Sequence, residues 1–209
     1  EHEVNGDMVY LHERVASLVE PVEESVLLST LRSMKAIAFD LNGYWLYYGF
    51  ARTLADRAAA CEDDNEKLAL LRLSERVYRV CTASDELTVE AWFGLGLVQL
   101  AQENLNGARE TLAFALELSG SSVDAELYFA YGEVLERLNQ NDAALSVYQK
   151  GREAYPKDIR FVYNQGRVHF VLGNNDKAIE YFEATLQAVD PSSEFAKELQ
   201  KTLERLKNE

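Results

Sequence analysis

Three short stretches, AWFGLG (91–96), LYFAYG (127–132) and FVYNQG (161–166), each place a glycine after an apolar segment that contains an aromatic residue. The three glycines are separated by 36 and 34 residues, and an alanine follows each of them after twelve residues. A period of this length is typical of stacked repeats, in which each repeat is one supersecondary unit. The sequence therefore predicts an array of similar units.

The pattern inside each unit predicts two helices joined by a short turn. Small residues at Gly96 and Ala108 allow two helices to approach closely, while Leu112 fills the space beside them. The equivalent alanines and large residues are Ala144 and Tyr148, and Ala178 and Phe182. Between the two halves lie polar breaks of Asn, Gly and Asp, residue types that suit tight turns. These breaks are 102–106, 139–142 and 173–176.

This pattern resembles the tetratricopeptide repeat family, whose unit of about 34 residues is a helix-turn-helix. The resemblance covers about residues 89–191 and implies an all-α fold, a right-handed superhelical array of antiparallel helix pairs called an α-solenoid. The matching residues are Trp92, Gly96, Ala108, Leu112 and Ala115, then Tyr128, Gly132, Ala144, Tyr148 and Pro156, then Val162, Gly166, Ala178, Phe182 and Pro191. The two prolines stand where a second helix must end, because proline cannot continue a helix.

Beyond the last repeat, the sequence predicts a C-terminal capping helix over 192–209. A terminal unit would otherwise expose its apolar face to water, and the segment carries an apolar stripe that can cover it. The stripe consists of Phe195, Leu199, Leu203 and Leu206. Binding of a partner or of a second copy to the same stripe is an open alternative. The repeats themselves are expected at 89–124, 125–158 and 159–191.

The N-terminal part of the chain shows a weaker version of the pattern. The stretch WLYYGFA (45–51) repeats the Trp and Gly spacing of the first unit, which predicts a degenerate repeat-like helix pair with an acidic loop over 42–88. The polar stretch CEDDNEKLA (61–69) is long for a turn, so either a longer first helix or an acidic loop accounts for it. Residues 1–41 are periodic as helices are, and they either form a diverged repeat or lie in the groove.

The sequence lacks the motifs of the common enzyme classes, so we predict a non-enzymatic protein with no catalytic residue, cofactor or metal site. No phosphate-binding GKS/T loop, GxSxG motif or GxGxxG fingerprint is present. The histidines His2, His12 and His169 have no second His or Cys at metal-ligand spacing, and His169 is predicted to be packed inside a repeat. The formal charge of −14 argues against a nucleic-acid partner, because phosphate binding needs a Lys/Arg surface.

Cysteine content and hydropathy give a preference for the compartment. Cys61 and Cys81 are too few for a disulfide framework or a zinc site, which favours a reduced environment such as the cytoplasm. No run of eighteen apolar residues is present, so membrane insertion of this segment is not expected. The resembled family also occurs in organelles and bacterial envelopes. Because the chain begins at Glu1 rather than Met, an upstream anchor or export signal is an open alternative.

In the resembled family, the first helices of the repeats line a concave surface that receives peptides, helices or folded partners. Residues at spacings of three to four positions share one face of a helix. Counting from the three glycines, the residues expected to face this groove and bind a partner are Glu90, Phe93, Leu97, Leu100, Glu126, Phe129, Glu133, Glu136, Arg160, Tyr163, Asn164, Arg167 and Phe170.

An aromatic residue recurs once in each first helix, at Phe93, Phe129 and Tyr163. Such a ladder along a groove would anchor an apolar ligand, because exposed aromatic residues in a concave site are common anchors of binding. The alternative is that the three rings pack between adjacent repeats.

Charge changes along the expected groove in a way that would orient a bound segment. The middle unit contributes acids and the last unit contributes bases, namely Glu126, Glu133 and Glu136 against Arg160 and Arg167. Chaperone-binding members of the resembled family hold an acidic C-terminal tail with a clamp of Lys, Arg and Asn. Here only Arg160 and Asn164 resemble part of that clamp, so an acidic tail is not the expected ligand.

These observations together predict a protein-interaction scaffold or adaptor that binds an apolar or amphipathic segment of another protein in its groove. The alternative is a structural subunit of a larger multiprotein assembly or homo-oligomer. Such a subunit would dock through its convex face or its terminal helices.

Overall fold

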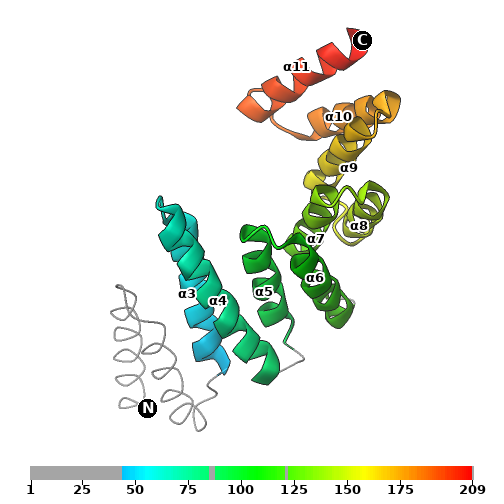
Figure 1. Cartoon of the computed structure of the whole chain (residues 1–209). Helices are drawn as coiled ribbons and strands as arrows, with labels where there is room; N and C mark the ends of the chain where they lie inside the picture. The colour runs from blue at the N-terminus through cyan, green and yellow to red at the C-terminus, as the bar shows by residue number, and fades with distance from the viewer. Residues whose placement is uncertain (1–43, 85–87, 121, 209) are drawn as a thin grey trace, which may run out of the picture. The chain divides into compact units, whose positions relative to one another are not determined.

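The computed structural model describes residues 44–84, 88–120 and 122–208. Over these ranges the chain forms nine helices, α3 to α11, and no strand, which confirms the predicted all-α class (Figure 1). The helices expected over 1–41 lie outside the described residues. Contacts divide the chain into two compact units, at 1–91 and 92–209, and each is described by itself.

The first unit contains two helices that pack against each other, α3 (Tyr44–Ala60) and α4 (Asp64–Ser84). Only residues 61–63 connect them, so the polar stretch after Cys61 mostly extends α4 rather than forming a long acidic loop. The buried Ser74 hydroxyl donates to the carbonyl oxygen of Ala51 at 2.7 Å and ties the helices together.

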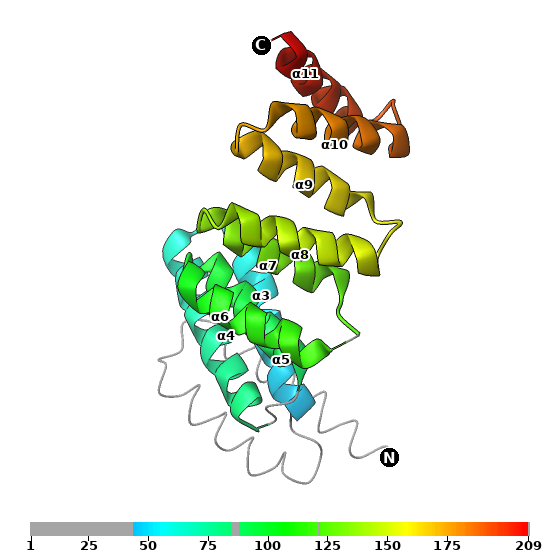
Figure 2. The ribbon, with the colours of Figure 1, turned by 90° about the vertical axis from the view of Figure 1, so that its right-hand side faces the viewer.

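The second unit is a succession of short helices, whose first member crosses the boundary between the units. The helices are α5 (Val89–Ala101), α6 (Leu105–Ser119), α7 (Ala125–Arg137), α8 (Asn141–Ala154), α9 (Ile159–Val171), α10 (Asn175–Ala188) and α11 (Glu194–Asn208). α7 packs on α8 and α9 on α10 within repeats, while α6 contacts α7, α8 contacts α9 and α10 contacts α11 between them. Figure 2 shows α7 to α11 following one another along this unit.

The repeat glycines mark points where the two helices of one unit touch. A Cβ atom built on Gly132 would lie 2.3 Å from the Tyr148 ring, so no larger residue fits there without movement. The same close approach joins Gly96 to Leu112 and Gly166 to Phe182. Gly49 differs, because a Cβ atom there would meet no atom of the described residues within 4 Å. The spacing that Gly49 shares with Gly96 therefore does not extend to its packing.

A second close approach joins neighbouring repeats. A Cβ atom on Gly151 in α8 would lie 2.2 Å from the ring of Phe161 in α9. Phe161 is completely buried, and burying a side chain of this size contributes about 1.5–3 kcal/mol to folding. Gly151 was not among the residues that the repeat pattern singled out.

The turns inside the three repeats share one backbone feature, a residue in the left-handed region. The φ angles are 63° at Glu103, 58° at Asn139 and 72° at Gly173. Glycine and asparagine tolerate this conformation, whereas glutamate adopts it at a cost. The predicted polar breaks are thus confirmed as turns.

Helix α11 covers the outer face of α10, as expected of a capping helix. Buried residues of α10 and α11 form one cluster, made of Ala178, Phe182, Leu199, Leu203 and Leu206. The Ser193 hydroxyl accepts a hydrogen bond from the Ala196 amide at 3.1 Å and begins the helix. The predicted place of Phe195 in this buried stripe is wrong, because its side chain is 41% exposed.

Candidate functional site

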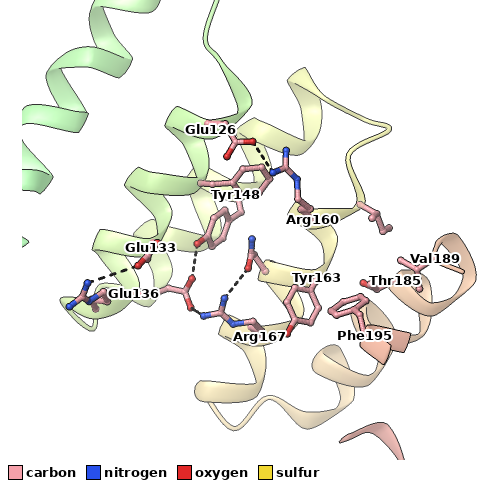
Figure 3. A pocket seen from close by; sticks show the side chains of 14 residues that line it. Glu126, Glu133, Glu136, Tyr148, Arg160, Tyr163, Arg167, Thr185, Val189 and Phe195 are labelled. Carbon is pink, nitrogen blue, oxygen red and sulfur yellow. Dashed lines mark hydrogen bonds and ion pairs between the residues drawn. The ribbon is translucent and has the colours of Figure 1, made fainter. Parts of the chain in front are cut away.

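A cavity of about 740 Å³ lies among helices α7 to α11 of the second unit, and we call it the α7–α11 pocket. Most of its lining comes from α7 and α9, the first helices of two consecutive repeats (Figure 3). The lining residues are Glu126, Phe129, Glu133, Glu136, Arg137, Tyr148, Ile159, Arg160, Tyr163, Asn164, Arg167, Thr185, Val189 and Phe195.

The pocket brings together eight of the residues predicted to face the groove. They are Glu126, Phe129, Glu133, Glu136, Arg160, Tyr163, Asn164 and Arg167. Phe170 lies outside the lining and is 47% exposed at the end of α9. The four residues predicted on α5 also lie outside it, with Glu90 and Leu97 exposed and Phe93 half-buried.

Leu100 is the predicted groove residue that the fold places in the core, at 9% exposure. It stands four residues after Gly96, as Glu136 stands four residues after Gly132. The Glu136 side chain is also largely covered, at 12% exposure. The fold thus covers this position in the first two repeats, whereas Phe170 at the same position of the third repeat is 47% exposed.

The predicted ladder of three exposed rings does not form as expected. The Phe129 ring of α7 stacks on the Phe161 ring of α9, with centroids 4.1 Å apart, and the Arg160 guanidinium lies 4.3 Å from the Phe129 centroid. Phe129 is thus half-buried between repeats, which agrees with the packing alternative. Tyr163 instead meets Phe195 of α11, with centroids 5.0 Å apart in an edge-to-face arrangement. This aromatic pair lines the pocket beside Val189 (Figure 3).

The predicted charge polarity is neutralised by ion pairs between the acids of α7 and the bases of α9. Arg160 lies 2.8 Å from Glu126, and Arg167 lies 3.1 Å from Glu136. Arg160 also donates to Asp158, whose pKa these hydrogen bonds hold below its usual range. The opposite charges therefore face each other across the two helices rather than succeeding one another along a groove.

One side of the pocket is a hydrogen-bonded network that links three helices. The Tyr148 hydroxyl of α8 donates to Glu136 Oε1 at 2.6 Å, while Glu136 Oε2 pairs with Arg167. Arg167 donates in turn to the side-chain oxygen of Asn164 at 3.0 Å. Burial, and then the hydrogen bond to Glu136, raise the pKa of Tyr148. Tyr148 thus remains protonated and donating at neutral pH, and Glu136 is held in place.

The repeat pattern missed six lining residues, of which two lie on the first helices α7 and α9 and four lie on or next to α8, α10 and α11. These lining residues are Arg137, Tyr148, Ile159, Thr185, Val189 and Phe195. A signal for Phe195 was present in the sequence, because it follows Pro191 by four residues, as Arg160 follows Pro156. Counting from the prolines would have placed Phe195 in the register of a pocket residue.

Comparison with known families agrees with this architecture. The family model described as tetratricopeptide repeat matches residues 93–159 and 129–193, which together include every helix of the α7–α11 pocket up to the start of α11. The chain is a tetratricopeptide repeat protein. A comparison with curated protein sequences gives no match.

Several solved structures share the tetratricopeptide fold with this chain. YrrB, described as a TPR protein with an unusual peptide-binding site, is 22% identical with a TM-score of 0.63, covering 84% of each chain. MamA from Desulfovibrio magneticus RS-1 is 16% identical, with a TM-score of 0.63 over 87% of this chain and 94% of that one. PcrH from Pseudomonas aeruginosa is 23% identical, with a TM-score of 0.51 over 57% of this chain and 91% of that one. At these identities the likeness establishes the fold.

The buried histidine of the third repeat has a packing role. His169 is buried and its ring stacks on Tyr181, as predicted for a packed histidine. Among the described residues, no group of three His, Cys, Asp or Glu side chains is placed to hold a metal ion. Within the same residues, no helix has both the length and the apolar character needed to cross a bilayer.

Proposed function

We propose that this tetratricopeptide repeat protein is a non-enzymatic scaffold or adaptor that binds an apolar or amphipathic segment of a partner protein in the α7–α11 pocket. The observation that carries the proposal is the Tyr163–Phe195 pair beside Val189 in a cavity of about 740 Å³. Phe195 remains 41% exposed although the rest of its helix stripe is buried. Exposed aromatic residues in a concave site are typical anchors of binding.

The polar part of the pocket supports the same function, because most of its charges already have partners within the protein. Glu126 and Arg160 pair with each other, and Glu136 pairs with Arg167. A ligand that inserts an apolar side chain between these pairs leaves none of them unpaired. The pairs also fix the orientation of α7 relative to α9, so the pocket is largely formed before a ligand arrives.

The proposal is tested with a random peptide library displayed on phage and selected on the full chain. Selected peptides are then measured by fluorescence anisotropy against the wild type and against the double variant Tyr163→Ala/Phe195→Ala. We expect roughly tenfold or greater weakening, since loss of an anchoring aromatic residue commonly costs more than 1 kcal/mol. Phe170→Ala is the matched control, because Phe170 lies on α9, is 47% exposed and does not line the pocket. Equal binding by the double variant and wild type contradicts the proposal.

A separate observation favours the alternative role as a subunit of an assembly. Three consecutive apolar residues at the end of α9 are exposed, with Phe170 at 47%, Val171 at 65% and Leu172 at 40%. A contact through them would bury apolar surface outside the pocket. Light scattering on wild type and Val171→Asp tests the homo-oligomeric form, which predicts a larger species that the charge disrupts. A wild type that is monomeric at every concentration contradicts it.

A further inference from the structure

We infer that the segment bound in the α7–α11 pocket carries a lysine or arginine as well as its apolar anchor, and that this cation pairs with Glu133. The inference rests on the proposed function and specifies the chemistry of the ligand. The charged groups that line the pocket differ in how closely the protein itself already pairs them.

The arginines that line the pocket are already paired with carboxylates of the protein. Arg160 lies 2.7 Å from Asp158 and 2.8 Å from Glu126, and it covers the ring of Phe129. Arg167 pairs with Glu136 and donates to Asn164. An acidic ligand would have to displace one of these carboxylates, and the displaced group would then lie near the ligand.

The third arginine of the pocket, Arg137, is bound by a residue that does not itself line the pocket. It donates a hydrogen bond to Glu103, which lies in the turn between α5 and α6. Its second carboxylate neighbour is Glu133, one helical turn earlier in α7, and those charged atoms are 4.0 Å apart. Arg137 is therefore shared between two acids, with Glu103 as the closer one.

Among the described residues that line the pocket, Glu133 is consequently the carboxylate whose charge is least neutralised by a nearby cation. Within the part of the chain that the structure describes, its one ion pair is the 4.0 Å contact with Arg137, and its side chain is 56% exposed. Glu126 and Glu136 have cations at 2.8 Å and 3.1 Å, and Glu136 also accepts from Tyr148. A cation brought by a ligand would find Glu133 without breaking a closer pair.

The apolar anchor and Glu133 lie at different sides of the pocket. Figure 3 shows Glu133 on one side with Glu136, and Tyr163, Val189 and Phe195 on the other. A ligand that uses both must therefore place its basic residue and its apolar residue apart. The formal charge of −14 adds a general attraction for basic segments at low salt. The expected ligand is thus an amphipathic segment of basic rather than acidic character.

Peptides from the phage selection on the full chain provide the test. We expect the enriched sequences to combine a large apolar residue with Lys or Arg, and Glu133→Gln to weaken their binding roughly two- to fivefold. Added salt should weaken wild-type binding more than binding to Glu133→Gln, because salt screens the pair. Glu117→Gln is the matched control, since it removes the same charge from an exposed residue of α6 outside the pocket. A charge exchange, Glu133→Arg with the peptide base changed to Glu, should restore part of the affinity.

The outcomes separate the inference from the proposed function. Peptides that lose affinity for Tyr163→Ala/Phe195→Ala, yet carry no base or bind Glu133→Gln as well as wild type, overturn the inference and leave the pocket function intact. Peptides that respond equally to Glu133→Gln and Glu117→Gln also overturn it, because the effect is then one of net charge. A selection that yields only peptides indifferent to the Tyr163 and Phe195 changes, or none, overturns both.

Discussion

Glu126 and Arg160 are 34 residues apart in the chain, and their side chains lie 2.8 Å apart in the fold. The separation equals the distance between the repeat glycines Gly132 and Gly166, so both residues occupy the same position in consecutive repeats. Arg137 also donates a hydrogen bond to Glu103 of the preceding repeat, but the first two repeats are 36 residues apart, so these two residues occupy different repeat positions. Opposite charges thus connect neighbouring repeats directly, and in the Glu126–Arg160 pair they stand at the same repeat position.

The first prediction concerns this connection. Arg160→Lys should lower the free energy of unfolding by about 1 kcal/mol, because lysine keeps the charge but loses the two-pronged contact with Asp158 and the stacking on Phe129. Glu126→Gln should cost less, since the pair is about half exposed and water screens it. Urea unfolding followed by circular dichroism measures both. A larger loss for Glu126→Gln than for Arg160→Lys would show that the ion pair matters more than the stacking.

The second prediction concerns the close approach of helices. Gly132→Ala should destabilise the protein by about 1–3 kcal/mol, because the new methyl group would lie 2.3 Å from the Tyr148 ring. Gly49→Ala is the control, since no atom in the described part of the chain lies within 4 Å of its Cβ position and alanine favours a helix. Urea unfolding should therefore show a loss for the first change and no loss for the second. A harmless Gly132→Ala would mean that Tyr148 moves aside freely.

The third prediction is a dependence of stability on pH through His169. Burial, and then the nearby Lys177, lower the pKa of His169 below its ordinary value of 6.5, although Glu180 acts in the opposite direction. Below pH 6.5 the unfolded chain therefore binds the proton more readily than the folded chain does, and stability falls as the pH is lowered from 7 toward 5. His169→Leu should remove this loss, since Leu135 holds the equivalent position in α7. Thermal unfolding of both proteins across this pH range measures the difference. An unchanged pH profile in His169→Leu contradicts the assignment.

The fourth prediction separates the two thiols. Burial raises the pKa of Cys81 to about 12, and its side chain is 1% exposed, so it should resist alkylation at pH 8. Cys61 lies half-buried at the end of α3 and should react first. Mass spectrometry after iodoacetamide treatment should find one modified thiol in the native protein and two in denaturant. Rapid labelling of a Cys61→Ser variant would show that the first unit opens readily.

The structural features that recur in every repeat could be predicted from the sequence alone. The Gly132 and Ala144 register, the turn near Asn139 and the proline at Pro156 recur because each solves the same packing problem in each unit, and a single chain displays them several times. The helical face of eight pocket residues followed from the same register. The exposed side chain of Phe195 did not follow, because its stripe pattern is equally consistent with a buried face.

Pairing between units was also beyond the sequence pattern. The acids of α7 and bases of α9 read as a gradient along a groove, whereas the distance between the two helices allows Arg167 to reach Glu136. Leu100 is a further example, because it is buried whereas Phe170, at the same register position of the last repeat, is exposed. Such features depend on distances between helices, and periodicity alone contains no such distances.

The contact between Gly151 and Phe161 makes the repeats non-interchangeable. The equivalent contact positions one repeat earlier hold Ala115 and Leu127, a larger residue of α6 with a smaller one of α7. If the unit 125–158 were deleted, Phe161 would face Ala115, whose methyl group would occupy the space that the ring needs. The order of the repeats therefore depends on matched side-chain sizes where neighbouring repeats touch. In a chain with shuffled repeats, side chains would clash at these contacts although each repeat kept its own fold.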